Sequence, residues 1–445
     1  MKKFTVLALA ALLVVAFTAP ASALENIFGG YWQTRFATQK NFDGDNTGAL
    51  DIRQVDTRTR LYYTAKINDN LKLVNKFEMD TQWGNPNKTA ITPGQPLQSN
   101  NWGDDGADGV AIEIKNSYAD FNVGPVNFLV GIQNFKLARG FIMDDDASGM
   151  KAIWKVNEGL YLPFVWIKNK EGGAGDDENE QDIDMYIFTP VIYLTKDIKI
   201  NPYYVLLHSQ DGLLMAGLTN LVDNINASIA GVDFDAKIGA ASLWFTGIYQ
   251  FGTVTTQTAA LTGTAKEEID LKGYLLAAGG KFDLGKADIH GQAFFATGEE
   301  ESSASTYGDK EINAYFTTSY TSYYWAEIMG NGIFDNLTGG FSDASVGAPA
   351  DAPSNILAVN LGATFKPMDK LSITADLWYA KLDEKNIFGK DKLGTEADLL
   401  ISYKLVEGLT LDVVGAYLWA GDATSGDGKN DRNPYEFGTR LSLSF

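Results

Sequence analysis

Two groups of charged side chains in this 445-residue sequence could act on a dissolved ion. Three consecutive carboxylates, Asp144, Asp145 and Asp146, follow the short apolar segment Phe141-Ile142-Met143. Basic residues share one parity within two earlier segments: Arg58, Arg60, Lys72 and Lys76. Opposed charges across a narrow passage create a transverse field that selects solutes by charge. The alternative for the aspartates is a solvated acidic surface loop.

The segments that carry the basic residues alternate between polar and apolar side chains. In residues 55–67, Asp56, Arg58 and Arg60 alternate with Val55, Leu61 and other residues of the opposite parity. Residues 71–83 behave in the same way, with the lysines on one parity and leucine, phenylalanine and tryptophan on the other. A period of two is that of a β-strand. We therefore expect strands with one charged face and one apolar face.

Short turns and long loops follow one another in strict succession. The short turns lie at residues 68–70, 124–125, 157–159, 195–197, 284–286, 367–370 and 406–408, and the long acidic loops include Gly84–Gly109, Asn169–Gln181 and Gly421–Asn433. This layout is typical of a transmembrane antiparallel up-and-down β-barrel, with short periplasmic turns and long extracellular loops. A soluble sandwich or propeller has no reason to segregate its turn lengths. We expect about 18 strands, with about 16 or 20 as alternatives.

The N-terminal segment differs from the rest of the chain. Residues 1–23 combine two lysines, an apolar run and a final Ala-Ser-Ala, which predicts a secretory signal peptide followed by one barrel domain over residues 24–445. A membrane anchor needs a longer apolar stretch. The chain has no cysteine, so no disulfide stabilises it, and its formal charge is −20. That charge speaks against nucleic acid and favours cations or neutral solutes.

The last strand predicted ends on an aromatic residue. Phe437, Leu441, Leu443 and Phe445 share one parity. We expect this strand to pair with residues 29–39, because an open sheet edge is not tolerated in lipid. Aromatic belts are expected at both ends of a membrane barrel. The candidates are Trp83, Trp166, Trp378 and Trp419 towards the loops, and Tyr193, Phe282, Phe365 and Phe445 towards the turns.

On these features the chain resembles bacterial outer-membrane porins over nearly all of residues 24–445. The C-terminal residues Phe437, Leu441, Leu443 and Phe445 are similar to the targeting signal of such barrels. Two stretches, VGIQNFKLARG at residues 130–140 and SYYWAEIMGNGIFDN at residues 322–336, more loosely resemble a Gly-x-Gln strand and an aromatic loop of the alginate-export and substrate-specific porin group. That group usually carries arginine at the position of Ile132, so no substrate identity carries over.

The resemblance implies a bacterial outer-membrane location, contact with lipid and handling by the barrel assembly machinery. General porins are usually homotrimers, whereas the specific families include monomers. In porins the third long loop commonly folds into the pore, which here assigns residues 138–149, with Asp144, Asp145 and Asp146, to an acidic constriction facing the basic residues. The function expected is passive diffusion of small hydrophilic solutes and ions, with cation preference.

Other functions stay open as alternatives. One is a substrate-specific channel for a saccharide or an anionic solute, with the lumenal arginines and lysines as its track. Another is a surface protein in which the barrel anchors calcium-binding loops. Neighbouring acids in a loop repel unless neutralised, which predicts weak Ca²⁺ sites but no other cofactor. These candidate sites are Asp43, Asp45, Asp104, Asp105 and Asp108.

Enzyme chemistry has few residues to use. His208 is expected at the outer rim and His290 in the lumen, and no hydrolase, metalloprotease or phosphate-loop motif occurs. We therefore expect no catalysis. The long loop from Glu299 to Ser354 is dense in aromatic residues, for which packing is favoured over stacking on sugars.

Overall fold

The computed structural model describes residues 24–42, 51–84, 112–171, 182–209, 222–256, 268–299, 310–318, 323–334, 352–386, 388–424 and 432–445. Residues 1–23, the predicted signal peptide, lie outside these ranges. In the part of the chain described, no helix is long and apolar enough to cross a membrane.

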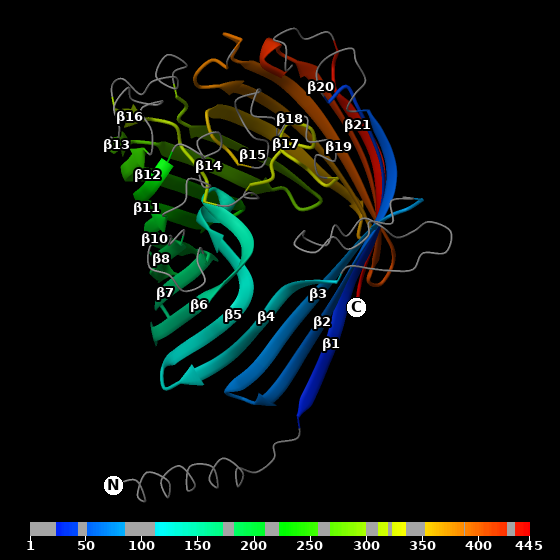
Figure 1. Cartoon of the computed structure of the whole chain (residues 1–445). Helices are drawn as coiled ribbons and strands as arrows, with labels where there is room; N and C mark the ends of the chain where they lie inside the picture. The colour runs from blue at the N-terminus through cyan, green and yellow to red at the C-terminus, as the bar shows by residue number, and fades with distance from the viewer. Residues whose placement is uncertain are drawn as a thin grey trace, which may run out of the picture.

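Antiparallel strands form one sheet that closes on itself (Figure 1). Its first half contains β1 (Glu25–Lys40), β2 (Ile52–Asn68), β3 (Leu71–Gln82), β4 (Glu113–Val123), β5 (Val126–Leu137), β6 (Met143–Asn157), β7 (Leu160–Lys170), β8 (Ile183–Phe188), β9 (Val191–Thr195) and β10 (Ile198–Ser209). Its second half contains β11 (Val222–Ile238), β12 (Ala241–Thr256), β13 (Glu268–Leu271), β14 (Tyr274–Asp283), β15 (Ala287–Ala296), β16 (Glu311–Ile312), β17 (Ile356–Met368), β18 (Leu371–Leu382), β19 (Lys392–Val406), β20 (Leu409–Ala420) and β21 (Tyr435–Ser444). Within the residues described, two short 3₁₀ helices, η1 (Ala138–Gly140) and η4 (Asp422–Thr424), follow β5 and β20.

The barrel has 18 strands, as expected. β8 and β9 together make one interrupted strand, because both pair with β7 and with β10. The interruption falls at Pro190, which lacks a backbone donor. β13 and β14 likewise both pair with β12, and β16 is a short parallel addition beside β13.

The order of turns follows the sequence prediction, with one addition. Each predicted short turn joins two neighbouring strands, from residues 68–70 between β2 and β3 to residues 406–408 between β19 and β20. A further turn between β11 and β12 was missed, because it carries no Asn, Asp or Pro. Gly239 makes this turn by adopting a φ of +61°.

The two faces of the strands sort as expected. Large apolar side chains such as Leu61, Leu73 and Leu361 are exposed on the outer face. The predicted belts are confirmed for Trp83, Trp166 and Trp419 and for the four aromatics near the turns. Trp378 was placed wrongly: it is 3% exposed and packs against Trp325 inside the barrel. It shares the parity of Asp376, and in a barrel the charged parity faces the lumen.

Closure joins the last strand to the first. β21 pairs with β1 in a register that sets Thr34 opposite Leu441 and Thr38 opposite Phe437. Gly30 donates its backbone N–H to the Phe445 carbonyl at 2.8 Å, so the terminal residue itself takes part in the seam. A Cβ at Gly30 would lie 2.8 Å from the Arg60 carbonyl and would overlap the Phe445 ring. The seam therefore needs glycine there.

We predict that Gly30→Ala destabilises the closed barrel by about 1–3 kcal/mol, the usual range for overpacking. The measurement is the fraction of protein that keeps the faster mobility of a folded barrel on unheated detergent gels along a urea series. Gly415→Ala is the matched control, because nothing lies within 4 Å of a Cβ at that strand position. Equal urea midpoints for the two variants would contradict the seam geometry.

Candidate functional site: the lumenal constriction

The connection between β5 and β6 bends into the barrel (Figure 1). We call residues 137–143 the hairpin tip. Phe141 and Ile142 are fully buried there. Arg139 reaches the far wall, where its Nε donates to Thr246 Oγ1 at 3.0 Å and its guanidinium pairs with Asp235 at 2.9 Å. These contacts hold Arg139 at a φ of +60°, an unfavourable conformation for a residue with a side chain.

The three predicted loop aspartates lie on strand β6, not on a loop. The β5–β6 pairing continues to the tip, with Lys136 opposite Asp144 and Asn134 opposite Asp146. Asp144 pairs with Lys136 at 2.6 Å, and Asp146 pairs with Lys115 at 3.0 Å. Because lysines neutralise two of the three charges, the acidic run can extend as a strand. The expected loop of residues 138–149 is thus wrong from residue 143 onward.

The predicted basic residues lie on β2 and β3, and most of them are ion-paired. Arg58 faces Asp80 across the strands at 2.6 Å, Arg60 pairs with Glu78, and Lys72 pairs with Asp120 at 2.9 Å. Lys76 differs from them: within the described ranges it forms no ion pair, and its Nζ lies 5.6 Å from the centre of the Tyr62 ring. This wall of the barrel is therefore close to electrically neutral.

A second segment also lies inside the barrel. We call residues 310–318 and 323–334, between β15 and β17, the inner loop. Tyr315 donates its hydroxyl to the Phe141 carbonyl at 2.7 Å, and Thr318 donates its backbone N–H to the Ile142 carbonyl at 3.0 Å. The rings of Tyr323 and Phe141 stack with centroids 3.9 Å apart. The hairpin tip and the inner loop therefore meet and narrow the lumen together.

Most aromatic residues of the inner loop pack against other side chains, whereas Tyr324 is exposed. Trp325 packs edge-on against Phe294 and Trp378. Tyr323 donates its hydroxyl to Gln292 at 2.6 Å. Burial raises the pKa of Tyr323 to about 12, so this hydroxyl keeps its proton at neutral pH. The interpretation of these aromatics as packing residues agrees with the contacts.

The inner loop is also fixed to the wall at its far end. Glu396 on β19 accepts the backbone N–H groups of Ile328 at 2.6 Å and Met329 at 2.9 Å. Phe334 is buried against Ala37 and Val414, at the seam of the barrel. The loop thus spans the lumen from β12 to β1.

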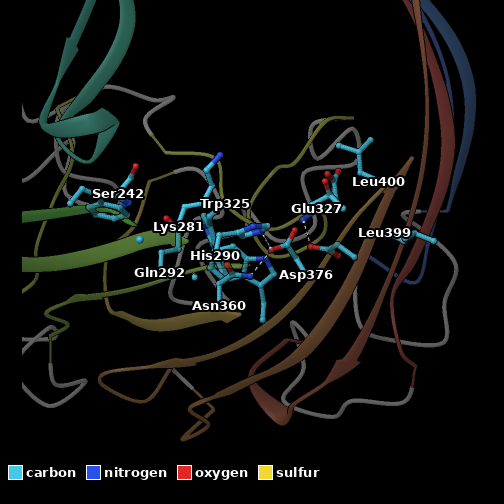
Figure 2. Close-up of a pocket in the computed structure, with 16 residues that line it drawn as sticks. Ser242, Lys281, His290, Gln292, Trp325, Glu327, Asn360, Asp376, Leu399 and Leu400 are labelled. Atoms are coloured by element: carbon cyan, nitrogen blue, oxygen red, sulfur yellow. Dashed lines mark hydrogen bonds and ion pairs between the residues drawn. The ribbon is translucent and has the colours of Figure 1, made fainter. Parts of the chain in front are cut away.

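Two neighbouring rows of residues run across six strands from β12 to β19, and most of their members line a cavity of about 410 Å³ (Figure 2). One row, in register order, is Ser242, Lys281, His290, Gly362, Asp376 and Asp398. The next row is Trp244, Gly279, Gln292, Asn360, Trp378 and Glu396. Trp325 and Glu327 of the inner loop cover the cavity from the lumen side.

Hydrogen bonds and glycines hold this surface in shape. Asp376 accepts a hydrogen bond from Asn360 at 2.9 Å and lies 3.1 Å from His290 Nε2 (Figure 2). A Cβ at Gly362 would overlap both the Asp376 carboxylate and the His290 ring, and one at Gly279 would overlap the Trp244 indole. The two glycines therefore make room for the pair and for the ring. His290 lines the lumen, as predicted.

The carboxyl groups on this side lack lysine and arginine partners. Among the described residues, Asp376, Glu396 and Asp398 form no ion pair with lysine or arginine; they contact His290, amides and backbone N–H groups, and Glu396 and Asp398 also hydrogen-bond to each other. The sequence analysis missed all three. The alternation of residues 374–380 and 394–400 could have found them, since a charged parity marks the inner face.

The remaining predicted sites are the aspartates proposed for weak cation binding and the rim residue His208. Asp43, Asp45, Asp104, Asp105 and Asp108 lie outside the described residues. Within the described ranges no group of three or more His, Cys, Asp or Glu is placed to hold a metal ion. His208 lies 2.7 Å from Asn226, next to outward-facing Leu206.

A closed 18-stranded barrel with an apolar outer face and a polar, narrowed lumen defines the fold of an outer-membrane porin. No family model and no curated protein matches the sequence. Solved structures do match.

OccAB1 of Acinetobacter baumannii has a TM-score of 0.56 at 12% identity, covering 96% of this chain and 99% of that one. OccK1 (OpdK) of Pseudomonas aeruginosa gives 0.58 at 9% identity, covering 95% and 98%. A BenF-like porin from Pseudomonas fluorescens Pf-5 gives 0.56 at 10% identity, covering 95% and 99%. At these identities the likeness establishes a shared fold.

We predict that Arg139→Ala releases the hairpin tip from the β11–β12 wall and produces larger, noisier single-channel currents. The physical reason is the loss of the contacts to Thr246 and Asp235, which oppose the strained backbone. Lys136→Ala is the control. It removes the same charge from the same hairpin, but Lys136 is exposed and its ion-pair partner, Asp144, belongs to the hairpin itself. Indistinguishable current noise in the two variants would show that Arg139 does not restrain the tip.

Proposed function

We propose that this chain forms a water-filled outer-membrane channel for passive diffusion of small hydrophilic solutes and ions, with a preference for cations. The observation that carries the proposal is the charge asymmetry of the lumen. On the β1–β4 wall Arg35, Arg58, Arg60, Lys72 and Lys115 have acidic partners and Lys76 has none, whereas Asp376, Glu396 and Asp398 on β18 and β19 have no lysine or arginine partner in the described part of the chain.

An uncompensated carboxylate in a narrow passage attracts cations. At about 4 Å and an effective dielectric constant near 20, one unit charge attracts another by roughly 4 kcal/mol. Salt weakens this attraction beyond about 10 Å at 0.1 M, so only carboxylates at the narrowest part act strongly. Asp376 meets this condition, because it lines the cavity beside the inner loop, and the hydrogen-bonded pair of Asp398 and Glu396 lies next to it.

The hairpin tip supplies the opposing side of the constriction. Of its three neighbouring aspartates, Asp145 alone has no ion pair among the described residues, and it adds to the negative potential. Asp144 and Asp146 serve chiefly to hold Lys136 and Lys115. The acidic constriction predicted from sequence is thus proposed in an altered form, with its main charge on β18 and β19.

A channel for an anionic solute is the second candidate. Lys76 supports it, because it is a basic residue without an ion pair in the described ranges, as is Lys151 on β6. One OpdK structure of the same fold was determined with vanillate, an aromatic carboxylate. If the channel is anion-selective, the residues that bind the solute would lie on β2 and β3 instead.

For assembly, we propose that Phe437 and Phe445, with Leu441 and Leu443 between them on the outer face of β21, form the signal read by the barrel assembly machinery. A homotrimer is expected by analogy with general porins. Sedimentation of the detergent-solubilised barrel measures the oligomeric state.

The proposal is tested by the zero-current potential of the channel in a planar bilayer under a salt gradient. We predict a cation-directed potential, and a fall of about threefold to tenfold in the cation-to-anion permeability ratio for Asp376→Asn/Asp398→Asn. Such a fall corresponds to roughly 0.7–1.4 kcal/mol of lost attraction.

Asp69→Asn/Glu158→Gln is the matched control, because it makes the same change in formal charge on exposed periplasmic turns. Its permeability ratio should equal that of the unmodified channel. An anion-directed potential in the unmodified channel would reject cation preference and favour the second candidate, an anion channel in which Lys76 contacts the solute.

A further inference from the structure

Two carboxyl groups on β19 hold the far end of the inner loop against the wall. The carboxyl oxygens of Glu396, which is fully buried, accept the backbone N–H groups of Ile328 at 2.6 Å and Met329 at 2.9 Å. The preceding N–H group, that of Glu327, donates to Asp398 Oδ2 at 3.4 Å (Figure 2). Three successive N–H groups of the loop therefore point at one pair of side chains, and the position of the loop depends on the state of that pair.

The pair of carboxyl groups holds a proton. Glu396 and Asp398 are two residues apart on the same face of β19, and their side chains hydrogen-bond to each other. An ionised carboxylate can only accept, so a hydrogen bond between two carboxyl groups requires a proton on one of them. Two carboxylates in contact away from bulk water do not both ionise without a large cost. The pair therefore carries one shared proton and one negative charge.

The surroundings of the pair do not neutralise a second negative charge. Glu327 of the inner loop, Asp376 on β18 and Glu436 on β21 all interact electrostatically with the pair or with each other. Arg35 on β1 acts on Glu436, but its guanidinium is already ion-paired to β2. From β15, His290 hydrogen-bonds to Asp376. The residues of β20 opposite the pair are apolar.

The inner loop brings one of these negative charges to the pair itself. Glu327 Oε2 accepts the backbone N–H of Ile333 at 2.8 Å, so the Glu327 side chain is held within the loop segment that the pair anchors. If the shared proton is lost, the hydrogen bond between Glu396 and Asp398 disappears and two like charges lie beside Glu327. Repulsion then acts directly on the loop, because Glu327 cannot turn away without giving up its own hydrogen bond.

We propose that the Glu396–Asp398 pair is a pH-sensitive switch that sets the width of the lumen. While the pair keeps its proton, the inner loop lies against β19 and the lumen is narrow; when the proton is lost, residues 326–333 leave the wall and the lumen widens. The switch rests on the proposed channel function and regulates it. It acts on this end of the loop alone, because Tyr315 and Thr318 bind the hairpin tip through a neutral hydroxyl and a backbone N–H.

The test measures the width of the conducting pore with neutral polyethylene glycols of graded size, which lower the single-channel conductance only when they enter the channel. This measurement reports width and not charge, so ionisation of a wall carboxyl alone leaves it unchanged. The pH series runs from about 5 to about 10, because buried carboxyl groups can titrate well above exposed ones. For the unmodified protein, the largest polymer that enters should shift to a larger size as the pH rises, along a curve for a single proton.

Two amide substitutions in the pair have opposite expected results. Asp398→Asn gives Glu396 a permanent N–H donor and should keep the small cut-off over the whole series. Glu396→Gln replaces one acceptor of the loop N–H groups by an NH₂ donor and should give the large cut-off already at the acid end. His290→Gln is the control for the neighbouring titratable group. It should keep the shift at the same pH, because His290 hydrogen-bonds to Asp288 and Asp376 on the wall.

A cut-off that stays constant with pH in the unmodified, conducting channel would overturn the switch. A shift that persists in Asp398→Asn, or that disappears in His290→Gln, would also overturn it, because another group would then be the one that titrates. The mobility of each variant on unheated detergent gels shows that the barrel is folded, and the Asp398→Asn and His290→Gln results decide the case even if Glu396→Gln does not fold. A folded protein that conducts at no pH would instead reject the proposed function.

Discussion

The hydrogen-bonded seam between β1 and β21 is the constraint on which the rest of this structure depends. In hydrocarbon an unpaired backbone N–H or carbonyl costs several kcal/mol, so a sheet in lipid must close. Closure brings Gly30 against Phe445 and completes a ring of 18 strands. Once the ring is closed, every strand has one face in lipid and one in the lumen, and the parity of each side chain determines its surroundings.

The same requirement for satisfied backbone groups governs the segments inside the barrel. Their carbonyls and N–H groups bond to side chains of the wall and to each other. Gln250 donates to the Phe316 carbonyl at 2.6 Å and accepts its N–H at 3.0 Å, and Glu396 accepts two N–H groups of the inner loop. Glu396 therefore anchors the loop as well as contributing charge. The negative side of the lumen arises partly because carboxylates are good acceptors for the N–H groups of a loop backbone that is buried inside the barrel.

Much of the fold could be predicted from local pattern, because a barrel strand shows its two faces directly in the alternation of its residues. The strand number, the closure and the lumenal position of His290 follow from that rule. Asp144 and Asp146 show its limit: consecutive acids suggest a loop, and the lysines that neutralise them, Lys136 and Lys115, come from other positions along the chain.

The shape of the site could not be predicted from the sequence, for a different reason. Which residues form the rows from Ser242 to Asp398 depends on the register of five strand pairs, and a shift by one residue in any of them would move a row to the lipid face. The meeting of Phe141 with Tyr323 joins segments distant in sequence and has no local signal. Trp378 was misplaced, and Asp376, Glu396 and Asp398 were missed, against available information, since the charged parity of their strands already pointed inward.

The account depends most on the hairpin tip and the inner loop meeting within the lumen, and the absence of native cysteine allows this to be measured directly. The measurement is cross-linking of Phe141→Cys/Tyr323→Cys in the folded barrel by a short bis-thiosulfonate reagent. Efficient cross-linking, accompanied by steadier channel currents that revert on reduction, is the predicted result, with Phe141→Cys/Phe445→Cys as a non-linking control. Failure of the first pair to link in a barrel that is folded and conducting would contradict the constriction.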